Sequence, residues 1–324
     1  MFSKFQKIGA FRGAVKRFCD RAEFHKEIPP TVSYIGTIKL HGTNASIVLN
    51  NGEVSFCSRK RELAIGDDNA GFAGAMSALN LAPLLECAKR VTGLDNFAIY
   101  GEWAGKGVIK GAAISQIEKT MFIFGVKDLD ADCYLSMDVV AKISDPEGVI
   151  KNICDYPTYE MDIDFSSPEK FVNKIVSITD AIDKECPVAS TFGIKGFGEG
   201  VVWSPRDRAS FPDNEFVFKV KGEKHSVSKV KTTSKVDEVE IANIKEFVSL
   251  TVTENRLDQG VAHLKEMGLP LDRSSTATYI RWVVNDVMTE EADLISTKSI
   301  NKKKLPKEIS RIARTYLFEK IDSF

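Results

Sequence analysis

The chain has 324 residues, and Lys and Arg nearly balance Asp and Glu, which leaves a formal net charge of −1. This balance excludes a protein that holds nucleic acid through the charge of the whole chain, so such a partner would have to meet local basic clusters. Hydrophobic residues make up 43% and charged residues 27%, which excludes disordered and fibrous chains. The length favours two domains.

No apolar run approaches the ~18 residues that a membrane-spanning helix needs, so no membrane partner is expected. The six cysteines are widely spaced, without a CxxC pair or zinc-ligand spacing, and indicate reduced thiols. We therefore expect a cytoplasmic protein. The first residues are basic and free of acids until Asp20, as in mitochondrial transit segments, but the first functional candidate, Lys39, follows closely. A mitochondrial location is therefore the less favoured alternative.

Short apolar segments bounded by turn signals predict antiparallel sheet with helices between strands from residue 31 to residue 222. An Asn51-Gly52 pair predicts a hairpin between two of the strands. The expected strands cover residues 33–42, 45–50, 53–59, 96–103, 120–126, 199–204 and 215–221. Helices are expected at 71–91 and 167–182, the second capped by Ser166 or Ser167 with Pro168 at its first position.

Helical periodicity replaces this pattern after about residue 231, where a polar stretch resembles a linker. Apolar residues fall at helical spacing, as in Ile280, Val283, Val284 and Val287. The expected fold class is therefore α+β. An N-terminal domain of antiparallel sheets with flanking helices, residues 1–233, precedes a small all-helical domain, residues 234–324.

Lys39 is the first candidate functional residue. In a strand its side chain shares a face with His41, while Ile38 points to the other face. A surface lysine is the simpler interpretation when Lys39 is taken alone. Gly42 removes a side chain where another group, such as a nucleotide, could approach the backbone, and the Asn44 amide can donate to a phosphate.

Two glutamates and a pair of lysines lie beside later strands. Glu102 and Glu199 each stand next to a glycine at a strand end, where a carboxylate can face a ligand, a divalent metal or solvent. Alternation places Lys219 and Lys221 on one face of a strand, about 7 Å apart. This pair indicates either an anion site or a solvated edge strand guarded by lysines.

Two common nucleotide-binding patterns are missing from the sequence. Residues 101–107, GEWAGKG, approach a Walker A loop, but the glycine spacing is one residue short and no Ser or Thr follows Lys106. There is no GxGxxG fingerprint that opens a helix. The four histidines are scattered and predict no catalytic triad.

Six collinear motifs resemble those of the covalent nucleotidyltransferases, and within them the RNA ligase 2 family, which includes phage ligases and trypanosome editing ligases. The motifs are KLHG, SRKREL, YGEWAGKG, FIFGV, GEGVVW and FKVKG. The resemblance implies an ATP-grasp-like nucleotidyltransferase fold. His41 favours this family, because DNA ligases and capping enzymes usually carry aspartate there. Gly125 departs from members that have aspartate after the aromatic residue, and the role of that aspartate is open here.

The resemblance also implies a role for each matched residue. Lys39 matches the lysine that becomes linked to AMP, and Glu199 matches a carboxylate that helps to place metal. Glu102 matches the carboxylate that binds the ribose, and Phe124 the aromatic residue stacked on adenine. The remaining matched nucleotide contacts are Ile38, Asn44, Arg59 (with Arg61 as an alternative choice), Lys219 and Lys221.

These roles imply an ATP-dependent RNA ligase that seals 3′-hydroxyl and 5′-phosphate ends. The expected partner is RNA, as a nicked duplex, and the expected cofactor is Mg²⁺ with Mn²⁺ as a substitute. The protein is expected to be a monomer, in the host-cell cytoplasm if it is phage-encoded. One alternative is another covalent nucleotidyltransferase, a DNA ligase or capping guanylyltransferase, although these place an OB barrel after the last motif. The second alternative is a relative that binds nucleotide or RNA without catalysis.

The proposed nucleophile must be a neutral amine, whereas an unperturbed lysine has a pKa of ~10.4. Burial among apolar strands, Lys219, Lys221 and bound metal are expected to lower the Lys39 pKa. RNA phosphates are expected to meet basic residues of the linker or the tail, with ordinary solvated charge as the simpler interpretation of the tail. These are Lys221, Lys224, His225, Lys229, Lys231, Lys235, Lys302, Lys303, Lys304, Lys307, Arg311 and Arg314.

Overall fold

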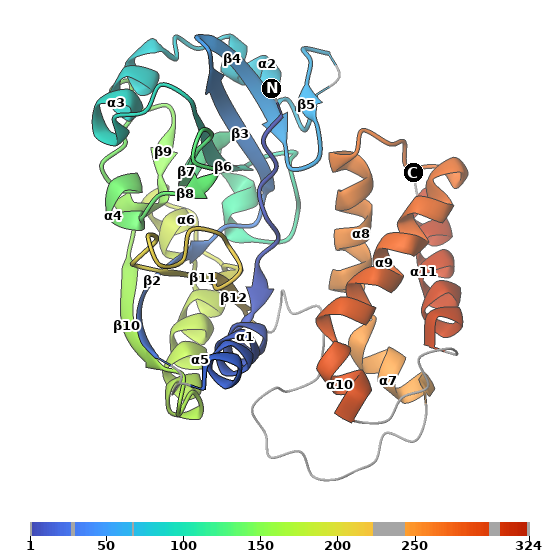
Figure 1. Cartoon of the computed structure of the whole chain (residues 1–324). Coiled ribbons are helices and arrows are strands. Elements are labelled where there is room, and N and C mark those ends of the chain that lie inside the picture. Colours follow the sequence, from blue (N-terminus) through green and yellow to red (C-terminus); the bar gives the residue numbers. More distant parts are fainter. Residues whose placement is uncertain (1, 27–29, 67, 223–243, 298–304, 323–324) are drawn as a thin grey trace. The chain divides into compact units, whose positions relative to one another are not determined.

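The computed structural model describes residues 2–26, 30–66, 68–222, 244–297 and 305–322. The chain forms two compact units, Met1–Lys224 and His225–Phe324, and each has its own hydrophobic core. Among the described residues, the first unit holds the strands and the second is helical (Figure 1). The α+β fold class is confirmed. The predicted domain boundary at residue 233 lies outside the described residues.

A five-stranded sheet carries Lys39 at the end of one strand. Its order is β1-β12-β11-β2-β10, with antiparallel neighbours except for the parallel β1–β12 pair. The strands are β1 (Gly9–Ala10), β2 (Thr31–Lys39), β10 (Thr158–Asp164), β11 (Gly200–Pro205) and β12 (Phe218–Lys221). Helices α1 (Phe11–His25) and α5 (Glu169–Lys184) pack against β12, and α5 also contacts β11.

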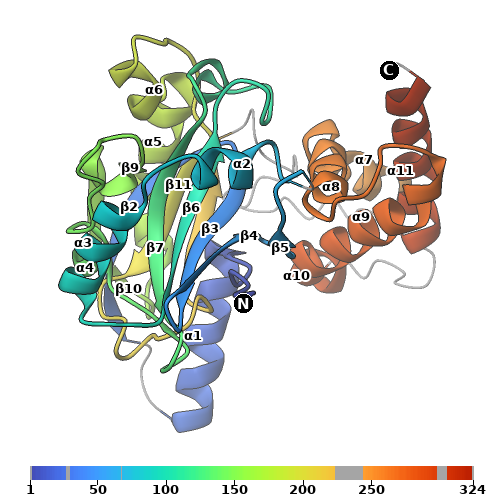
Figure 2. The same cartoon turned by 90° about the horizontal axis from the view of Figure 1, so that it is seen from above.

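The second sheet has the order β5-β4-β3-β6-β7-β8, and β9 pairs with β7. Its strands are β3 (Thr43–Asn50), β4 (Glu53–Ser58), β5 (Glu62–Leu63), β6 (Phe97–Ala104), β7 (Thr120–Asp128), β8 (Cys133–Tyr134) and β9 (Lys151–Asn152). Figure 2 shows β4, β3, β6 and β7 side by side. The shorter helices of this unit are α2 (Phe72–Ser77), α3 (Ala82–Thr92), α4 (Met137–Val140), α6 (Pro187–Thr191) and the 3₁₀ turns Ala113–Gln116 and Ile153–Asp155.

The chain passes from the first sheet to the second between Lys39 and Thr43, where β2 ends and β3 begins. Gly42 is needed at this crossing, because a Cβ atom there would lie 2.3 Å from the backbone oxygen of Trp103 and 3.0 Å from Glu102 Cγ. The close approach predicted for Gly42 is therefore made by β6 and not by a nucleotide. The strands predicted to run consecutively are present, but the first belongs to a different sheet from the next two.

Local predictions were confirmed at the hairpin and needed correction at the helices. Asn51 and Gly52 have φ values of 51° and 80°, as the predicted two-residue hairpin turn requires. The helix expected at 71–91 is two helices, α2 and α3. Helix α5 begins at Glu169 with Pro168 as its N-cap and without a side-chain cap hydrogen bond, so the predicted serine cap was wrong.

The second unit consists of α7 (Ile244–Thr251), α8 (Glu254–Glu266), α9 (Thr276–Glu290), α10 (Ala292–Thr297), α11 (Leu305–Asp322) and the 3₁₀ turn Arg273–Ser275. The predicted apolar stripe of α9 is confirmed, because Val283 and Val287 are fully buried and Ile280 and Val284 pack against them. Arg256 is also fully buried, with Asp286 at 3.0 Å and Glu291 at 3.1 Å. Within the described ranges, no helix is long and apolar enough to span a bilayer.

Candidate active site

Three neighbouring strands place Lys39 and Lys221 in one row. Gly200 of β11 is opposite Lys39 on β2 and opposite Lys221 on β12. Residues directly opposite in antiparallel strands point to the same face, so the two lysines share a face, as does Lys219 two residues earlier. Gly200 has a φ of +148°, and a Cβ atom there would lie 2.0 Å from the backbone oxygen of Val220. Glycine is therefore required between the lysines.

Glu199 lies between the two lysines. Its carboxylate oxygens are 2.8 Å from Lys39 Nζ and 3.1 Å from Lys221 Nζ. The glutamate side chain is 4% exposed, compared with 20% for Lys39 and 12% for Lys221. The structure thus joins three residues that lie far apart in the sequence around one buried carboxylate.

These contacts determine the charges of Glu199 and Lys39. Burial is the largest influence on the Glu199 pKa and would raise it, but Lys39 and Lys221 hold this pKa well below its usual range. Burial is likewise the largest influence on the Lys39 pKa and lowers it, but the Glu199 and Glu102 carboxylates outweigh it, so the Lys39 pKa is raised. The expectation of a lowered Lys39 pKa is therefore wrong for this state, because its nearest partner is an anion.

Glu102 and Asn44 face each other on β6 and β3 of the second sheet. Glu102 Oε1 accepts a hydrogen bond of 2.9 Å from the backbone N–H of Gly42. The Asn44 Oδ1 atom is buried and has no hydrogen-bond partner among the described residues. Buried polar atoms are normally paired, so this oxygen is suited to a ligand or to an ordered water.

The other predicted nucleotide contacts differ in their placement. The positive charge of Arg59 is close enough to lower the pKa of Lys39, and the choice between Arg59 and Arg61 as the phosphate contact stays a prediction. Phe124 is the extra residue of a β-bulge between β6 and β7, where bulges often redirect a side chain, and it is half-buried. Ile38 is only 2% exposed because its side chain lies in the core. Its backbone atoms are therefore the ones suited to a nucleotide contact.

His41 lies in the site, although the sequence analysis assigned it no chemical role. Its Nδ1 atom is 3.4 Å from Glu199 Oε2. Its Nε2 atom is 3.1 Å from the backbone oxygen of Lys110, which can only accept, so Nε2 carries a hydrogen. The available signal was its position two residues after Lys39 on the same strand face.

Glu199 is the carboxylate through which this site could bind a metal ion, and its printed neighbours are Lys39, Lys221 and His41. No cluster of three or more His, Cys, Asp or Glu side chains suited to a metal occurs in the described part of the chain. Mg²⁺ needs no such cluster, because it binds through one or two carboxylates together with substrate phosphates and water. Glu199 fits that requirement when nucleotide phosphates are present, and it does not fit a closed structural zinc site.

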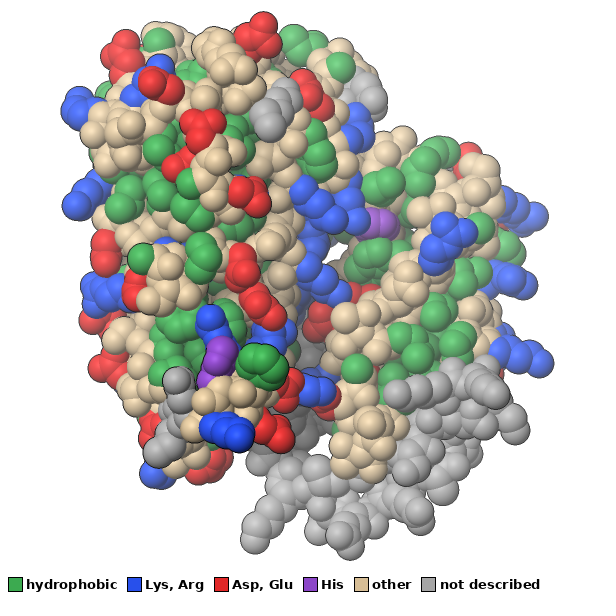
Figure 3. Space-filling model, in the orientation of Figure 1, with side chains coloured by type: hydrophobic (Ala, Val, Ile, Leu, Met, Phe, Trp, Pro, Cys, Tyr) green, Lys and Arg blue, Asp and Glu red, His purple; other side chains and the backbone are tan. Residues whose placement is uncertain are grey.

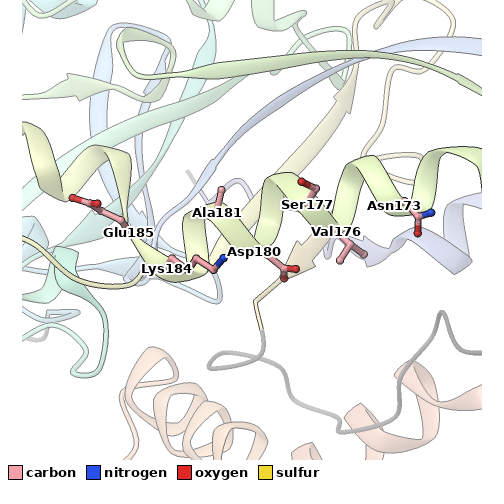
Figure 4. Close-up of a pocket in the computed structure, with 7 residues that line it drawn as sticks. All are labelled: Asn173, Val176, Ser177, Asp180, Ala181, Lys184 and Glu185. Carbon is pink, nitrogen blue, oxygen red and sulfur yellow. The ribbon is translucent and has the colours of Figure 1, made fainter.

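A separate pocket runs along α5, from Asn173 to Glu185 (Figure 4). None of the predicted site residues lines it. Figure 3 shows acidic and basic side chains interspersed over the visible face of the first unit. The buried carboxylate with its cations therefore remains the candidate active site.

Comparisons with known proteins bear on the same region. A family model described as RNA ligase matches residues 32–221, a span that contains every predicted site residue. Two solved structures of an RNA ligase from Naegleria gruberi are similar to part of this chain. A lysine-to-methionine variant with AMP and Mn is 18% identical, with a TM-score of 0.45, and the match covers 68% of this chain and 56% of that chain. A lysine-to-alanine variant with ATP and Mn is 16% identical, with a TM-score of 0.47, and the match covers 68% and 55%.

The matched region spans little more than half the length of these solved chains. No curated protein matches the chain.

Proposed function

Since this chain belongs to the RNA ligase family, we propose that it is an ATP-dependent RNA ligase that joins 3′-hydroxyl and 5′-phosphate ends through a lysyl-AMP intermediate. The observation that carries the proposal is the buried Glu199 carboxylate held between Lys39 and Lys221. A solvated edge strand would expose these lysines and would not bury a carboxylate between them. The favoured substrate is a nick in duplex RNA.

The first proposed step is attack of Lys39 Nζ on the α-phosphorus of ATP. A nitrogen–phosphorus bond forms, the bond from the α-phosphorus to the bridging oxygen breaks, and pyrophosphate leaves. The amine must lose a proton before it attacks. Lys219 and Lys221 share the face of Lys39 and are placed to hold the α-phosphate oxygens, where negative charge is stabilised by fixed cations.

Lys39 cannot attack phosphorus while Glu199 holds it as an ammonium group. The ion pair between them therefore has to break when nucleotide enters. A divalent cation, Mg²⁺ or Mn²⁺, held by Glu199, phosphate oxygens and water would neutralise this carboxylate and supply Lewis-acid stabilisation of the phosphates. Burial and Arg59, which lower the Lys39 pKa, would then be opposed by Glu102 alone.

The second sheet is proposed to hold the nucleoside. The Gly42 N–H donates to Glu102 Oε1 at 2.9 Å and so orients this carboxylate, which we propose binds a ribose hydroxyl. Asn44 offers its amide beside it, and half-buried Phe124 offers part of its ring to adenine. Lys39 lies just before the crossing between the two sheets, and Glu102 contacts Gly42 within the crossing. The two sheets together would therefore hold the ribose in a fixed position relative to the nucleophile.

The later steps use RNA. AMP passes from Lys39 to the RNA 5′-phosphate, and the 3′-hydroxyl then attacks that phosphorus, so that AMP leaves and the strand is closed. We propose that the first unit performs adenylylation and that the helical unit contacts RNA phosphates through the exposed Lys307, Arg311 and Arg314 of α11. The other predicted basic residues, Lys224 to Lys235 and Lys302 to Lys304, lie outside the described residues. A monomer in the cytoplasm remains the expected state.

The test is to incubate the full chain with Mg²⁺ and ATP labelled at the α-phosphate, and then with a set of nicked and single-stranded substrates. Covalent label on the protein and sealing of nicked duplex RNA are expected. Labelling by GTP in place of ATP would favour a capping enzyme, and preferential sealing of nicked DNA would favour a DNA ligase. Nucleotide binding without label or a burst of pyrophosphate would indicate a non-catalytic relative.

A further inference from the structure

We propose that the N-terminal segment Ser3–Gln6 forms a permanent wall of the adenine pocket, in which Phe5 is the residue that positions Phe124. The inference rests on the proposed function, because it takes Phe124 as the residue that stacks on the base. It adds a residue from outside the six sequence motifs and outside the region matched by the family model.

Hydrogen bonds fix this segment to three separate parts of the first unit. The Ser3 side chain is 7% exposed, and its Oγ is 2.7 Å from the Tyr100 hydroxyl on β6. The Gln6 backbone N–H donates to the Tyr134 hydroxyl of β8 at 3.1 Å. The Gln6 side-chain oxygen accepts from the Asn214 backbone N–H at 2.8 Å. Ser3 and Phe5 point inwards, while Phe2 and Lys4 are exposed, as expected for an extended segment laid on a sheet.

Phe5 contacts three aromatic rings at once. Its ring centroid is 5.1 Å from that of Tyr100, 5.2 Å from Phe124 and 5.6 Å from Tyr134. The planes of Phe5 and Phe124 are inclined by 70°, which is the edge-to-face arrangement that aromatic pairs favour. Because Phe124 sits in a bulge, the sheet ladder alone does not fix its side chain, and Phe5 supplies a packing partner.

This cluster lies on the same sheet face as the proposed ribose contact. Tyr100 and Glu102 are two residues apart on β6, so their side chains point to one face. The opposite residues on β3 are Ser46 and Asn44. A nucleoside held by Glu102 and Asn44 would therefore have the Phe5 cluster next to it along the strands.

The contacts favour a fixed wall over a plug that nucleotide displaces. Removal of the segment would leave the Tyr100 and Tyr134 hydroxyls and the Asn214 N–H without these partners. Burial raises the pKa of both tyrosines, so their hydroxyls stay neutral and keep their hydrogens for these bonds. Phe124 is only half-buried with Phe5 in place, which leaves part of its ring open.

The test compares Phe5→Ala, Phe5→Leu and Phe5→Tyr in the full chain, with Phe24→Ala as the control because Phe24 is 83% exposed. Calorimetry measures ATP affinity, and single-turnover labelling gives KM and the rate at saturating ATP. Loss of the ring contact is expected to weaken ATP binding about two- to tenfold and to raise KM equally, without changing the saturating rate. Phe5→Tyr should bind as the unaltered chain does, and Phe5→Leu should bind more weakly.

Other outcomes overturn the inference. Tighter ATP binding by Phe5→Ala would show that Phe5 is a plug, and unchanged binding by both Phe5→Ala and Phe5→Leu would show that the wall does not act on the nucleotide. Failure of the unaltered chain to bind ATP would overturn the proposed function as well. If Phe5→Ala does not fold, the comparison of Phe5→Leu with Phe5→Tyr decides, because both keep a large apolar side chain.

Discussion

The Nζ atom of Lys39 lies 2.8 Å from the Glu199 carboxylate, an ion pair between the proposed nucleophile and the proposed metal ligand. The pair raises the pKa of Lys39 and so favours its charged form, which is not a nucleophile. The same carboxylate also holds Lys221 at 3.1 Å. One buried anion thus holds together the two lysines that we propose act on the triphosphate.

Replacement of Lys39 by alanine is expected to abolish covalent labelling of the protein by ATP, because Lys39 is the proposed nucleophile and Lys221, the other amine that contacts Glu199, is proposed to hold the α-phosphate. Labelling is measured on a denaturing gel after incubation with Mg²⁺. The matched control is Lys184→Ala, which removes an exposed lysine from α5 and should label normally. Undiminished labelling of the Lys39 variant would refute the assignment of the nucleophile.

Glu199→Gln is expected to lower the pKa of Lys39. The Glu199 carboxylate is a main influence that raises this pKa, and its removal leaves Glu102 alone to oppose burial and Arg59, which lower it. Reactivity of Lys39 towards a small acylating reagent should therefore rise at a lower pH in the variant than in the unaltered chain. The reaction is followed by mass spectrometry in metal-free buffer, so that loss of metal binding does not confuse the result. A profile shifted to higher pH would contradict the ion-pair explanation.

Gly42→Ala is expected to destabilise the first unit by about 2 kcal/mol or more, because the added Cβ would lie 2.3 Å from a backbone oxygen that cannot move freely. Gly125→Ala is the control, since a Cβ there meets no atom within 4 Å, and its effect should stay within about 0.5 kcal/mol. Denaturant unfolding followed by tryptophan fluorescence measures both. Equal stability of the two variants would argue against the tight sheet crossing.

Arg256→Met is expected to destabilise the helical unit by about 3–5 kcal/mol, because it leaves Asp286 and Glu291 as buried carboxylates without their cation. The Arg256 guanidinium also donates to the backbone oxygen of Thr251. Arg311→Ala, which removes an exposed arginine paired with Glu308, should change stability far less, because solvent screens an exposed ion pair. Helix content during denaturation gives the comparison, and similar effects of both changes would show that the buried triad is dispensable.

Charge reversal at Lys307 and Arg314, exposed on α11, is expected to impair nick sealing while leaving self-labelling by ATP intact. Each lost phosphate contact should also make sealing less sensitive to salt. Sealing and labelling are measured on one preparation over a range of salt concentrations. If both activities fall together, the α11 charges serve folding rather than RNA contact.

Sequence periodicity predicted which side chains share a face of a strand or helix, but it did not predict which strands lie side by side. Alternation placed Lys219 and Lys221 on one face of a strand, and the stripe of Val283 and Val287 was found buried. Which strand would lie beside β12 was not predictable from spacing, because strand pairing joins residues far apart in the chain. The contact of Glu199 with Lys39 depends on that pairing, and so the sign of the Lys39 pKa shift was predicted wrongly.

Other features of the structure were not predicted because the sequence around them gives only weak local signals. Phe5 stands in a basic segment that resembles a transit peptide, and only the ring contacts reveal its place beside Phe124. His41 supported a family resemblance, but its bridge from Glu199 to the Lys110 carbonyl requires a loop 69 residues away. The serine cap expected for α5 failed because Pro168, whose φ is −65°, already has the backbone geometry of a helix start.

The short crossing between β2 and β3 also limits how this protein can diverge. Only residues 40–42 separate the end of one sheet from the start of the other. One inserted or deleted residue would turn Asn44 to the opposite face of β3, because strand side chains alternate. Substitutions are therefore tolerable at many positions around Lys39, whereas changes in chain length between Lys39 and Asn44 are not.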